Sequence, residues 1–504
     1  MRCRTEAISI AAHTEPMGNV KDIWWVELYC ASKRFVVLAL LAVSGCASPQ
    51  EQRESLLSFE VPATWSIVPG GTQSGATSLV QWWQRFDDPL LGTLVVEAMQ
   101  HNTTVSTAQA TLRQAWALRD VAAASLWPSL GGSGSAQHGT SGGKSTGNLF
   151  QVGVNANWVP DIFGSNRSAL NAADANAQSS AASLGDVQVA IAAEVGLSYI
   201  SLRNAQARLG IASENLANQE ETLQITQWRQ LAGLVTMLEV EQARAAAEQT
   251  RALVPALQTA IEQASHAIAV LTGRPPAALV AEFALVKMVP QAKEDLAWSI
   301  PAETLRQRAD IRAAERNVAA AMSRVDQANA ARLPTFALGG SLGLNALSLG
   351  TLTNGASVVS SIFASMAVSL FDGGAARAQV RVQQSAFDQA RLAYEAAVLA
   401  ALKEVEDALI ALQGDRNRLA SLRSAGESAA AASLLARQRY RSGLVDFQVV
   451  LETQRTQFST QDNVANANAD VSSDHVRLYK ALGGGWRPEA DSTSAIKADR
   501  TPTP

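Results

Sequence analysis

The longest regular pattern in the chain is a series of apolar positions, three and four residues apart, between positions 375 and 439. A sustained series of this kind is typical of a helix that packs along its length in a coiled coil. About 60 residues at roughly 1.5 Å each give a helix of about 90 Å. Gly443 ends the pattern, and a second helix is predicted over 447–482. The apolar positions of the first helix include Phe387, Ala390, Tyr394, Val398, Ala401, Val405, Ala408 and Leu412.

A second pattern, in which every other residue is apolar, precedes a long helical stretch. Val152, Val154, Ala156 and Trp158 alternate with Gln151, Gly153, Asn155 and Asn157. Alternation over about ten residues is typical of a strand in an outer-membrane barrel. A short helix is expected before each pair of strands. The expected strands are 129–140, 149–159, 335–346 and 361–371, and the short helices are 102–126 and 310–332.

The same order of elements occurs twice. A proline after a helix, a phenylalanine before a turn and two glycines recur at offsets between 206 and 210 residues. Similar composition alone would not keep four landmarks in register, so we infer an internal duplication. The first copy has its own pair of long helices, expected at 166–230 and 236–271. The matched landmarks are Pro128 and Pro334, Phe163 and Phe371, Gly233 and Gly443, and Gly273 and Gly483.

The duplication divides the chain into segments. Two repeats are expected, each containing a helix, two strands and a long helical hairpin. The predicted segments are an upstream extension with a signal peptide (1–45), an N-terminal anchor segment (46–100), the first repeat (101–275), a linker (276–300), the second repeat (301–486) and a polar tail (487–504).

Four strands are too few to form a closed barrel. Open sheet edges are not tolerated in lipid, and the smallest usual barrel has about eight strands. If the strands span a membrane, the chain must therefore form an oligomer. A dimer would supply eight strands and a trimer twelve. The long helices would then continue the lumen as a tube, and their small residues allow close lateral packing. The alternative is a coiled-coil stalk, which would favour large Leu or Ile at its core positions.

Composition excludes several classes of function. Apolar residues make up 47% of the 504 residues and charged residues 17%, yet no stretch reaches the roughly 18 consecutive apolar residues of a spanning helix. A polytopic helical membrane protein is therefore excluded. The net charge of −4 gives no basic surface for nucleic acid. No metal-binding, phosphate-binding or nucleophile motif is found, so neither an enzyme nor a cofactor is expected. The scattered histidines are His13, His101, His138, His266 and His475.

The N-terminal region contains a secretion signal. Lys33 and Arg34 precede an apolar run over 35–43, and Ser44-Gly45-Cys46 follows it. A basic segment, a short apolar run and small residues are typical of a signal peptide. The cysteine after two small residues makes the site similar to a bacterial lipobox, in which Cys46 would carry the lipid, palmitate included. Several acyl chains anchor a protein stably. The alternative is an ordinary signal with a chance cysteine.

Six motifs in order resemble the outer-membrane factor family of the TolC type, and the lipidated NodT-type efflux lipoproteins most closely. Together they cover about 80–486. Pro160 stands where the family usually has a leucine-type residue, and Ala309 stands where it has proline. Both positions lie at predicted element boundaries. The motifs are Trp82–Leu90, Trp158–Gly164, Leu305–Ile311 with Ala314 and Glu315, Leu370–Gly374, Glu404–Leu409, and Leu478–Trp486.

The resemblance implies an α+β membrane protein. Its expected fold is a trimeric twelve-stranded outer-membrane β-barrel, with four strands per chain, continued by a long α-helical periplasmic barrel. The implied function is the exit duct of a tripartite efflux system for small hydrophobic or amphiphilic compounds such as antibiotics. The implied partners are a periplasmic adaptor, an inner-membrane pump and outer-membrane lipid. Export of proteins by a type I secretion system is one alternative, and a lipid-anchored trimeric coiled-coil structural protein is another.

The resemblance also implies two kinds of site at the hairpin turns. Acidic side chains that ring the closed periplasmic mouth would correspond to Glu452 and Asp446, while Val449 stands at the family's other acidic position. Carboxylates close together in a narrow lumen repel one another and attract cations. The alternative for Glu452 is a solvated acid on the helix face, paired with the nearby Arg455, and the alternative for Asp446 is a helix-dipole role. The turns themselves would contact the adaptor. The expected contact residues are Gly233, Leu234, Val235, Gly443, Leu444 and Val445.

The end of the second predicted strand carries two aromatic residues. Trp158 and Phe163 are candidates for the aromatic girdle at the membrane interface. The alternative is that both rings are buried against a neighbouring helix.

Overall fold

The computed structural model describes residues 79–141, 145–292, 305 and 307–486. All of them belong to one compact unit, Val61–Pro504. Cys46 and the signal segment lie outside the described residues, as do the polar tail and most of the anchor segment.

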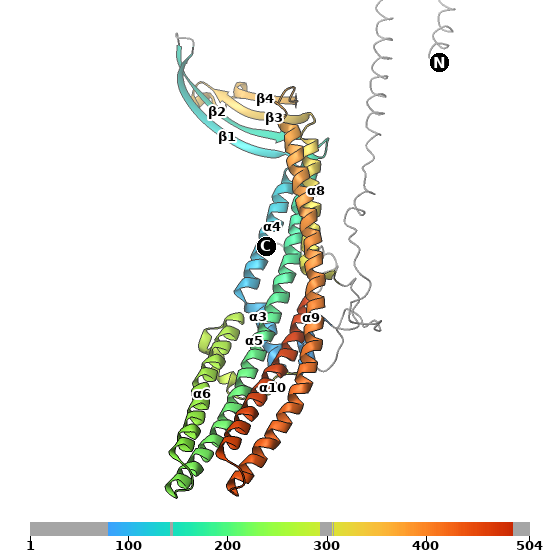
Figure 1. Ribbon diagram of the computed structural model, residues 1–504. Helices are drawn as coiled ribbons and strands as arrows, with labels where there is room; N and C mark the ends of the chain where they lie inside the picture. Colours follow the sequence, from blue (N-terminus) through green and yellow to red (C-terminus); the bar gives the residue numbers. More distant parts are fainter. Residues whose placement is uncertain (1–78, 142–144, 293–304, 306, 487–504) are drawn as a thin grey trace, which may run out of the picture. The chain divides into compact units, whose positions relative to one another are not determined.

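Four antiparallel strands form one sheet in the order β1-β2-β3-β4 (Figure 1). The strands are β1 (Ser129–Ser141), β2 (Ser145–Trp158), β3 (Thr335–Ala346) and β4 (Val358–Ala367). The central pairing, β2 with β3, joins the two repeats and runs from Phe150 opposite Ala346 to Trp158 opposite Leu338. Two single turns, η7 (Leu349–Thr351) and η8 (Gly355–Ser357), connect β3 to β4. All four strands were expected from the sequence.

The last strand begins and ends earlier than its pattern predicted. The expected range was 361–371, but residues 368–374 leave the sheet and form a turn. Gly373 and Gly374 adopt φ of 62° and 90° there, and the Asp372 carboxylate accepts from the backbone N–H groups of Gly374 and Ala376. These hydrogen bonds lower the pKa of Asp372. The turn therefore belongs to the start of the following helix.

The two faces of the sheet differ in polarity. Paired residues of neighbouring strands share a face, so the register groups Val152 and Val154 of β2 with Leu342 and Leu344 of β3. The other face is polar and is linked by hydrogen bonds across the strands. The bonds run from Asn155 Nδ2 to Ser133 Oγ (3.2 Å), from Ser135 Oγ to Gln151 Oε1 (3.2 Å), and between the hydroxyls of Ser341 and Ser361 (2.7 Å). One face thus suits lipid and the other suits water.

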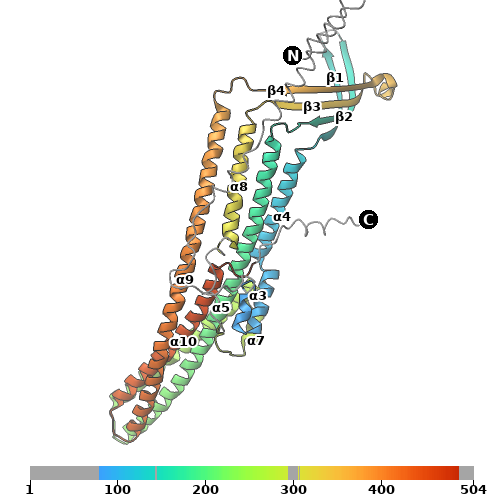
Figure 2. The ribbon, with the colours of Figure 1, turned by 90° about the vertical axis from the view of Figure 1, so that its right-hand side faces the viewer.

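Each repeat contains a short helix and a long helical hairpin. The long helices α5 and α9 each have 67 residues, which corresponds to about 100 Å. Figures 1 and 2 show both running from the sheet to a turn, after which a 35-residue helix returns. The helices are α4 (Thr103–Ala124), α5 (Ser165–Leu231) and α6 (Met237–Leu271) in the first repeat, and α8 (Ala309–Ala330), α9 (Ala375–Arg441) and α10 (Phe447–Ala481) in the second.

Both long helices begin in the same way. A glycine with positive φ is the N-cap of each, Gly164 for α5 and Gly374 for α9. An aspartate just before each glycine accepts backbone N–H groups of the first turn. Asp161 accepts those of Asn166 and Arg167, as Asp372 does at α9. Two of the family-like motifs therefore encode a helix start directly after a strand.

The apolar seam predicted on α9 is buried. Six of its eight positions have less than a tenth of their surface exposed, and Phe387 and Ala390 are half-buried. The series packs α9 against its neighbours α8 and α10. The six buried positions are Tyr394, Val398, Ala401, Val405, Ala408 and Leu412.

The first family-like motif forms elements that the pattern analysis did not predict. Residues Trp82–Phe86 make the short helix η3, and Pro89–His101 make α3. The Asp88 carboxylate caps α3 through the Leu90 N–H and accepts the Tyr199 hydroxyl at 2.6 Å. Further short elements, η4 (Pro276–Leu279) and α7 (Val280–Phe283), follow α6. None of the described helices is long and apolar enough to cross a bilayer.

Trp82 connects this segment to both repeats. Its indole is fully buried and stacks on Tyr479 of α10, with ring centroids 5.8 Å apart and planes at 19°. On the other side it fills the space beside Gly196 of α5, where a Cβ would lie 2.8 Å from the ring. Gly485, near the end of the last motif, donates its backbone N–H to Leu79. The first and last motifs therefore pack against each other.

A second junction forms around Arg308, which is almost completely buried. Its guanidinium donates to the Ala481 carbonyl at 2.6 Å, to Asp310 at 2.8 Å and to Glu404 at 2.9 Å. It thus ties the start of α8 to α9 and to the end of α10. Hydrogen bonds to the two carboxylates raise the pKa of Arg308 against the opposing effect of burial. Glu404, the first residue of the family-like motif Glu404–Leu409, is a partner in this junction.

The buried Trp82 leads to a stability prediction. Replacing Trp82 with Ala should reduce the free energy of unfolding by about 3–5 kcal/mol, because a buried indole is lost and a cavity remains. Thermal unfolding followed by circular dichroism measures the loss. Trp127→Ala is the matched control, because the Trp127 side chain is 75% exposed in the chain. Equal losses in the two variants would contradict the role of Trp82 as the junction.

Candidate functional site

The two hairpin turns have the same backbone. Gly233 and Gly443 adopt φ of 75° and 73°, a conformation that side chains rarely adopt. The N–H of the next residue bonds back to the helix, from Leu234 to the Arg229 carbonyl at 2.8 Å and from Leu444 to the Arg439 carbonyl at 2.9 Å. This is the Schellman pattern of a helix C-terminus. The glycines are therefore required by the turn, whatever binds there.

The side chains of the two turns differ. Apolar residues around the first turn are exposed, among them Trp228, Leu231, Leu234, Met237 and Leu238. The equivalent positions of the second turn are Gln438, Arg441, Leu444, Phe447 and Gln448, of which Phe447 is buried. Val235 and Val445 are half-buried. The first turn is thus largely apolar and the second largely polar.

An apolar cluster joins the second hairpin to α6 of the first, close to the turns. Tyr440 of α9 and Phe447 of α10 form its centre, with ring centroids 5.9 Å apart. Leu223 and Val445 pack against it from the edge. The buried members are Ala243, Ala246, Ala436, Tyr440, Phe447, Val450 and Leu451.

Polar contacts surround this cluster and also join the hairpins. Arg229 of α5 donates to the Tyr440 carbonyl at 3.1 Å, and its guanidinium lies 4.4 Å from the Tyr440 ring centroid, which is a cation–π contact. Arg441 of α9 pairs with Glu221 of α5 at 2.6 Å. Further bonds run from Arg437 to Asn218 (2.8 Å), from Gln448 to Gln242 (3.0 Å) and from Gln454 to Thr222 (3.0 Å). Moving one hairpin away from the other must break these contacts.

The acidic candidates are both exposed on the second hairpin. Asp446 is the N-cap of α10, but its side chain accepts no capping hydrogen bond. The first turn differs, because Thr236 and Glu239 form a capping box there. Glu452 follows the buried Leu451 and is itself exposed. Glu452 and Arg455 are both exposed, and no ion pair joins them among the described residues.

The two aromatic residues at the end of β2 and just beyond it have different surroundings. Trp158 is half-buried, and its indole N–H donates to the Leu126 carbonyl at 3.0 Å. This contact fixes the ring just beyond the end of α4. Phe163 is more exposed, and its ring centroid lies 6.4 Å from that of Phe336 of β3.

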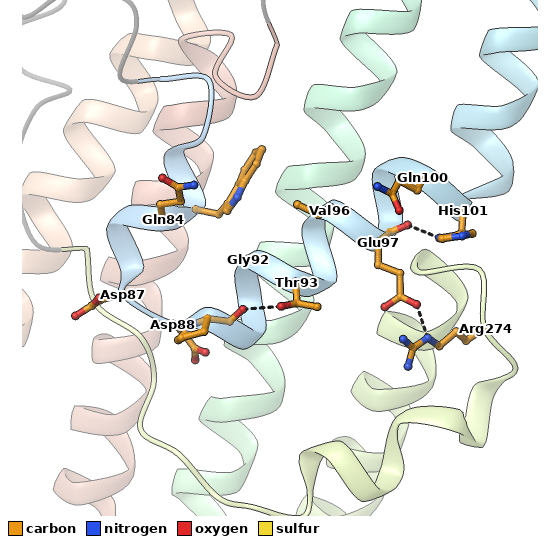
Figure 3. Close-up of a pocket in the computed structure, with 12 residues that line it drawn as sticks. Gln84, Asp87, Asp88, Gly92, Thr93, Val96, Glu97, Gln100, His101 and Arg274 are labelled. Atoms are coloured by element: carbon orange, nitrogen blue, oxygen red, sulfur yellow. Dashed lines mark hydrogen bonds and ion pairs between the residues drawn. The ribbon is translucent and has the colours of Figure 1, made fainter.

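A cavity of about 770 Å³ lies beside α3 and the end of α6 (Figure 3). The side chain of Arg274 reaches across to Glu97 at 2.5 Å and to Glu282 at 3.0 Å. These partners raise the pKa of Arg274. The pair Arg274–Glu97 links α3 to the end of α6, so it serves the fold. The lining residues are Trp83, Gln84, Asp87, Asp88, Pro89, Gly92, Thr93, Val96, Glu97, Gln100, His101 and Arg274.

The residues that join the hairpins were not found from the sequence. Arg229 and Tyr440, or Glu221 and Arg441, lie more than 200 residues apart, and no local pattern pairs them. The ion pair between Arg441 and Glu221 can be recognised only after the two hairpins are known to pack side by side. Among residues 79–141, 145–292, 305 and 307–486, no group of three His, Cys, Asp or Glu side chains is placed to hold a metal ion.

Comparison with known proteins gives a consistent result. A sequence model described as outer membrane efflux protein matches residues 94–274 and 300–484. The chain is 32% identical to nodulation protein T of Rhizobium leguminosarum bv. viciae, over 85% of this chain and 89% of that protein. It is 31% identical to the pyoverdine export outer membrane protein OpmQ of Pseudomonas putida, over 89% and 98%. The solved structure of the outer-membrane channel OprN is similar, with a TM-score of 0.80 and 35% identity over 86% of this chain and 99% of that one.

The contacts between hairpins lead to a prediction for their mobility. Changing Arg229 and Arg441 together to Ala should lower the local opening free energy near the turns by about 1–2 kcal/mol, because a cation–π contact and an ion pair are lost. Amide hydrogen exchange in 437–450 should then be about fivefold to thirtyfold faster. Arg439→Ala is the control, because Arg439 is exposed and makes no ion pair with any described residue. Unchanged exchange in the double variant would show that the apolar cluster alone holds the hairpins.

Proposed function

The chain belongs to the outer membrane efflux protein family, and on that premise we propose that it is the exit duct of a tripartite system that exports small hydrophobic or amphiphilic compounds. Membership confirms the resemblance drawn from the motifs and the internal duplication, because the family matches the chain twice. The protein is an outer-membrane efflux channel and not an enzyme. The cargo class, the trimer, the lipid anchor and the gate are the proposal.

The sheet is the observation that carries this function. It has an apolar face and a polar face. Among the described residues, β1 pairs only with β2 and β4 pairs only with β3, so the outer edge of each has no partner. Lipid does not tolerate unpaired strand edges, so β1 and β4 must pair with other copies. Two chains would form an eight-stranded barrel filled by its own side chains, whereas three would form a twelve-stranded barrel with a lumen. A trimer is therefore the assembly that supports export.

The helices support a continuous duct. At about 100 Å, α5 and α9 are long enough to extend the lumen far below the membrane. The repeats, proposed at 101–275 and 301–486, each supply one long hairpin to this tube. A coiled-coil stalk would have no use for a sheet with a hydrogen-bonded polar face. Specific observations thus favour the duct over the structural alternative.

The hairpin turns are the proposed contact with the periplasmic adaptor, which links the duct to an inner-membrane pump. Gly233, Leu234, Val235, Gly443, Leu444 and Val445 are the proposed contact residues. Exposed apolar side chains at the first turn support this role, because water-exposed Leu and Trp side chains in a cluster are typical of a protein-binding surface. The largely polar second turn would be the movable one.

Glu452 and Asp446 are the proposed gate. Both are exposed acids on α10 of that second hairpin, at and beyond the turn. In a trimer each would be present three times around the mouth. Like charges at short distance repel and favour cations, so they suit a mouth that is held shut by other contacts. The contacts of Tyr440 and Arg441 with the first hairpin would hold it shut.

Cys46 is the proposed lipid attachment site. The support is the lipobox-like sequence alone, because Cys46 lies outside the described residues. A lipid at this position would place the mature N-terminus at the inner face of the outer membrane, with the rest of the chain extending into the periplasm.

The cargo class is tested by deleting the gene and restoring it. Deletion should increase sensitivity to hydrophobic antibiotics, dyes and detergents, and the wild-type gene should reverse the change. Susceptibility across a panel measures this. If the panel is unchanged and secreted proteins are instead retained in the deletion strain, the protein-export alternative replaces drug export.

The gate is tested in planar lipid bilayers. Glu452→Gln should reduce the preference for cations, because three negative charges are removed from the mouth. The reversal potential in a salt gradient measures the preference, and Asp446→Asn should change it in the same direction. A reversal potential unaffected by Glu452→Gln would place this carboxylate outside the conduction path.

Lipid attachment is tested by metabolic labelling with palmitate. The wild-type chain should incorporate label, and Cys46→Ala should not, because the chain contains no cysteine after position 46. Label that persists in Cys46→Ala would contradict attachment at this residue.

A further inference from the structure

The strands of the sheet carry no carboxylate, ammonium or guanidinium side chain. None of the residues of β1, β2, β3 or β4 is Asp, Glu, Lys or Arg. The connection from β3 to β4, 347–357, also lacks charged residues. A lumen wall made from such strands would neither attract nor repel an ion through fixed charge. This part of the lumen would therefore distinguish between compounds through hydrogen bonds and apolar contacts.

The polar face contains one aromatic residue. Val359, Ser361, Phe363 and Ser365 of β4 alternate with residues of the opposite face, and Ser361 bonds to Ser341 at 2.7 Å on the polar side. Phe363 therefore points to the same side as these serines. The other aromatic residues of the four strands, Phe150, Trp158 and Phe336, have the opposite parity and lie on the apolar face.

The ring of Phe363 lies against the sheet rather than projecting freely. Its pairing partner on β3 is Gly339, and a Cβ built on this glycine would lie 2.2 Å from Cζ of the ring. Only a glycine leaves room for the ring at this place. The outer face of the ring is open, since 56% of the residue is exposed. Asn157 of β2 continues the same row beyond Gly339, and Ser361 and Ser365 flank Phe363 along β4 on the same face.

We propose that Phe363, lying on Gly339, is a binding contact for uncharged aromatic cargo in the lumen of the barrel. The inference rests on the proposed function, because only a trimer would bring three such rings around one lumen. A planar compound would stack on the exposed ring face, while neighbouring Ser and Asn side chains would hydrogen-bond to its polar groups. Because the strand residues supply no fixed charge that could pair with an ionised cargo, the available contacts are stacking and hydrogen bonding, which suit an uncharged aromatic compound. Weak, sequential contacts of this kind allow passage without trapping.

The orientation of Phe363 is tested first by cysteine labelling. The body of the chain after Cys46 contains no cysteine, so a single thiol can be introduced at will. In intact cells Phe363→Cys should react with a charged, membrane-impermeant thiol reagent. Ile362→Cys is the matched control, because Ile362 is the adjacent residue on the apolar face and is 88% exposed there. The reverse labelling, or no labelling of Phe363→Cys, would overturn the inference.

The binding role is tested by current block in planar bilayers, with coumarin as the uncharged aromatic probe and sorbitol as the non-aromatic control. In Phe363→Ala the half-blocking concentration of coumarin should rise about threefold to tenfold, which is the usual range for one aromatic contact. In Phe363→Leu the half-blocking concentration should rise less, because the leucine still covers Gly339. In Ile362→Ala it should equal that of the wild type. Sorbitol should act equally on all variants.

The two failures are distinguishable. Suppose that Phe363→Cys is labelled, but coumarin blocks the wild type and Phe363→Ala at the same concentration. This result would overturn the binding role of Phe363 and would leave the proposed duct function unaffected. A wild-type trimer that never conducts, or a chain that forms no trimer, would contradict the proposed function instead. In that second case the labelling experiment still decides which face of the sheet Phe363 occupies.

Discussion

The requirement that every backbone N–H and C=O in lipid find a partner governs this structure. One chain supplies four strands and therefore two unpaired edges, on β1 and β4. An open sheet of this kind cannot stay in a bilayer, so the barrel exists only between chains. Closure of the edges gives the sheet an outer and an inner surface. The apolar face can then contact lipid, and the polar face can line the lumen. Each strand pair is followed, after a short connection, by one long helix, so the long helices start from the sheet.

The family-like motifs serve the junctions between elements rather than transport itself. Asp161 and Asp372 start the two long helices after a strand. Trp82 and Arg308 fix where the shorter helices meet the long ones. Such positions leave few residue choices, because a cap needs a short side chain that accepts backbone N–H groups, and a buried junction accepts only side chains of a matching size and shape. The hairpin turns, where partners are proposed to bind, share the sequence Gly-Leu-Val and differ in most of the side chains around it.

Periodicity predicted the elements well, because one face of each long helix and strand is apolar over many residues. The duplication could be read from the sequence for the same reason. The turn at Asp372 limited the prediction for β4, since a helix cap and a strand end can both follow alternating residues. The helix α3 was missed because Leu91, Leu94, Val95 and Ala98 fill all its buried positions within 13 residues, too short a series to stand out. Contacts between the hairpins depend on packing of distant segments and leave no local signal.

The pairing of β2 with β3 has a consequence for how such a barrel could arise. This pairing joins two repeats within one chain, and the proposed pairing of β4 with β1 would join two repeats between chains. In a closed ring of three chains, six repeats would follow one another. Neighbouring repeats would belong alternately to the same chain and to different chains, and the ring would have approximate sixfold symmetry. A ring of six separate, identical repeats would have six identical turns. When two repeats are fused in one chain, their hairpin turns can diverge in sequence. One ring can then contain apolar turns that bind a partner protein and polar turns that move during opening.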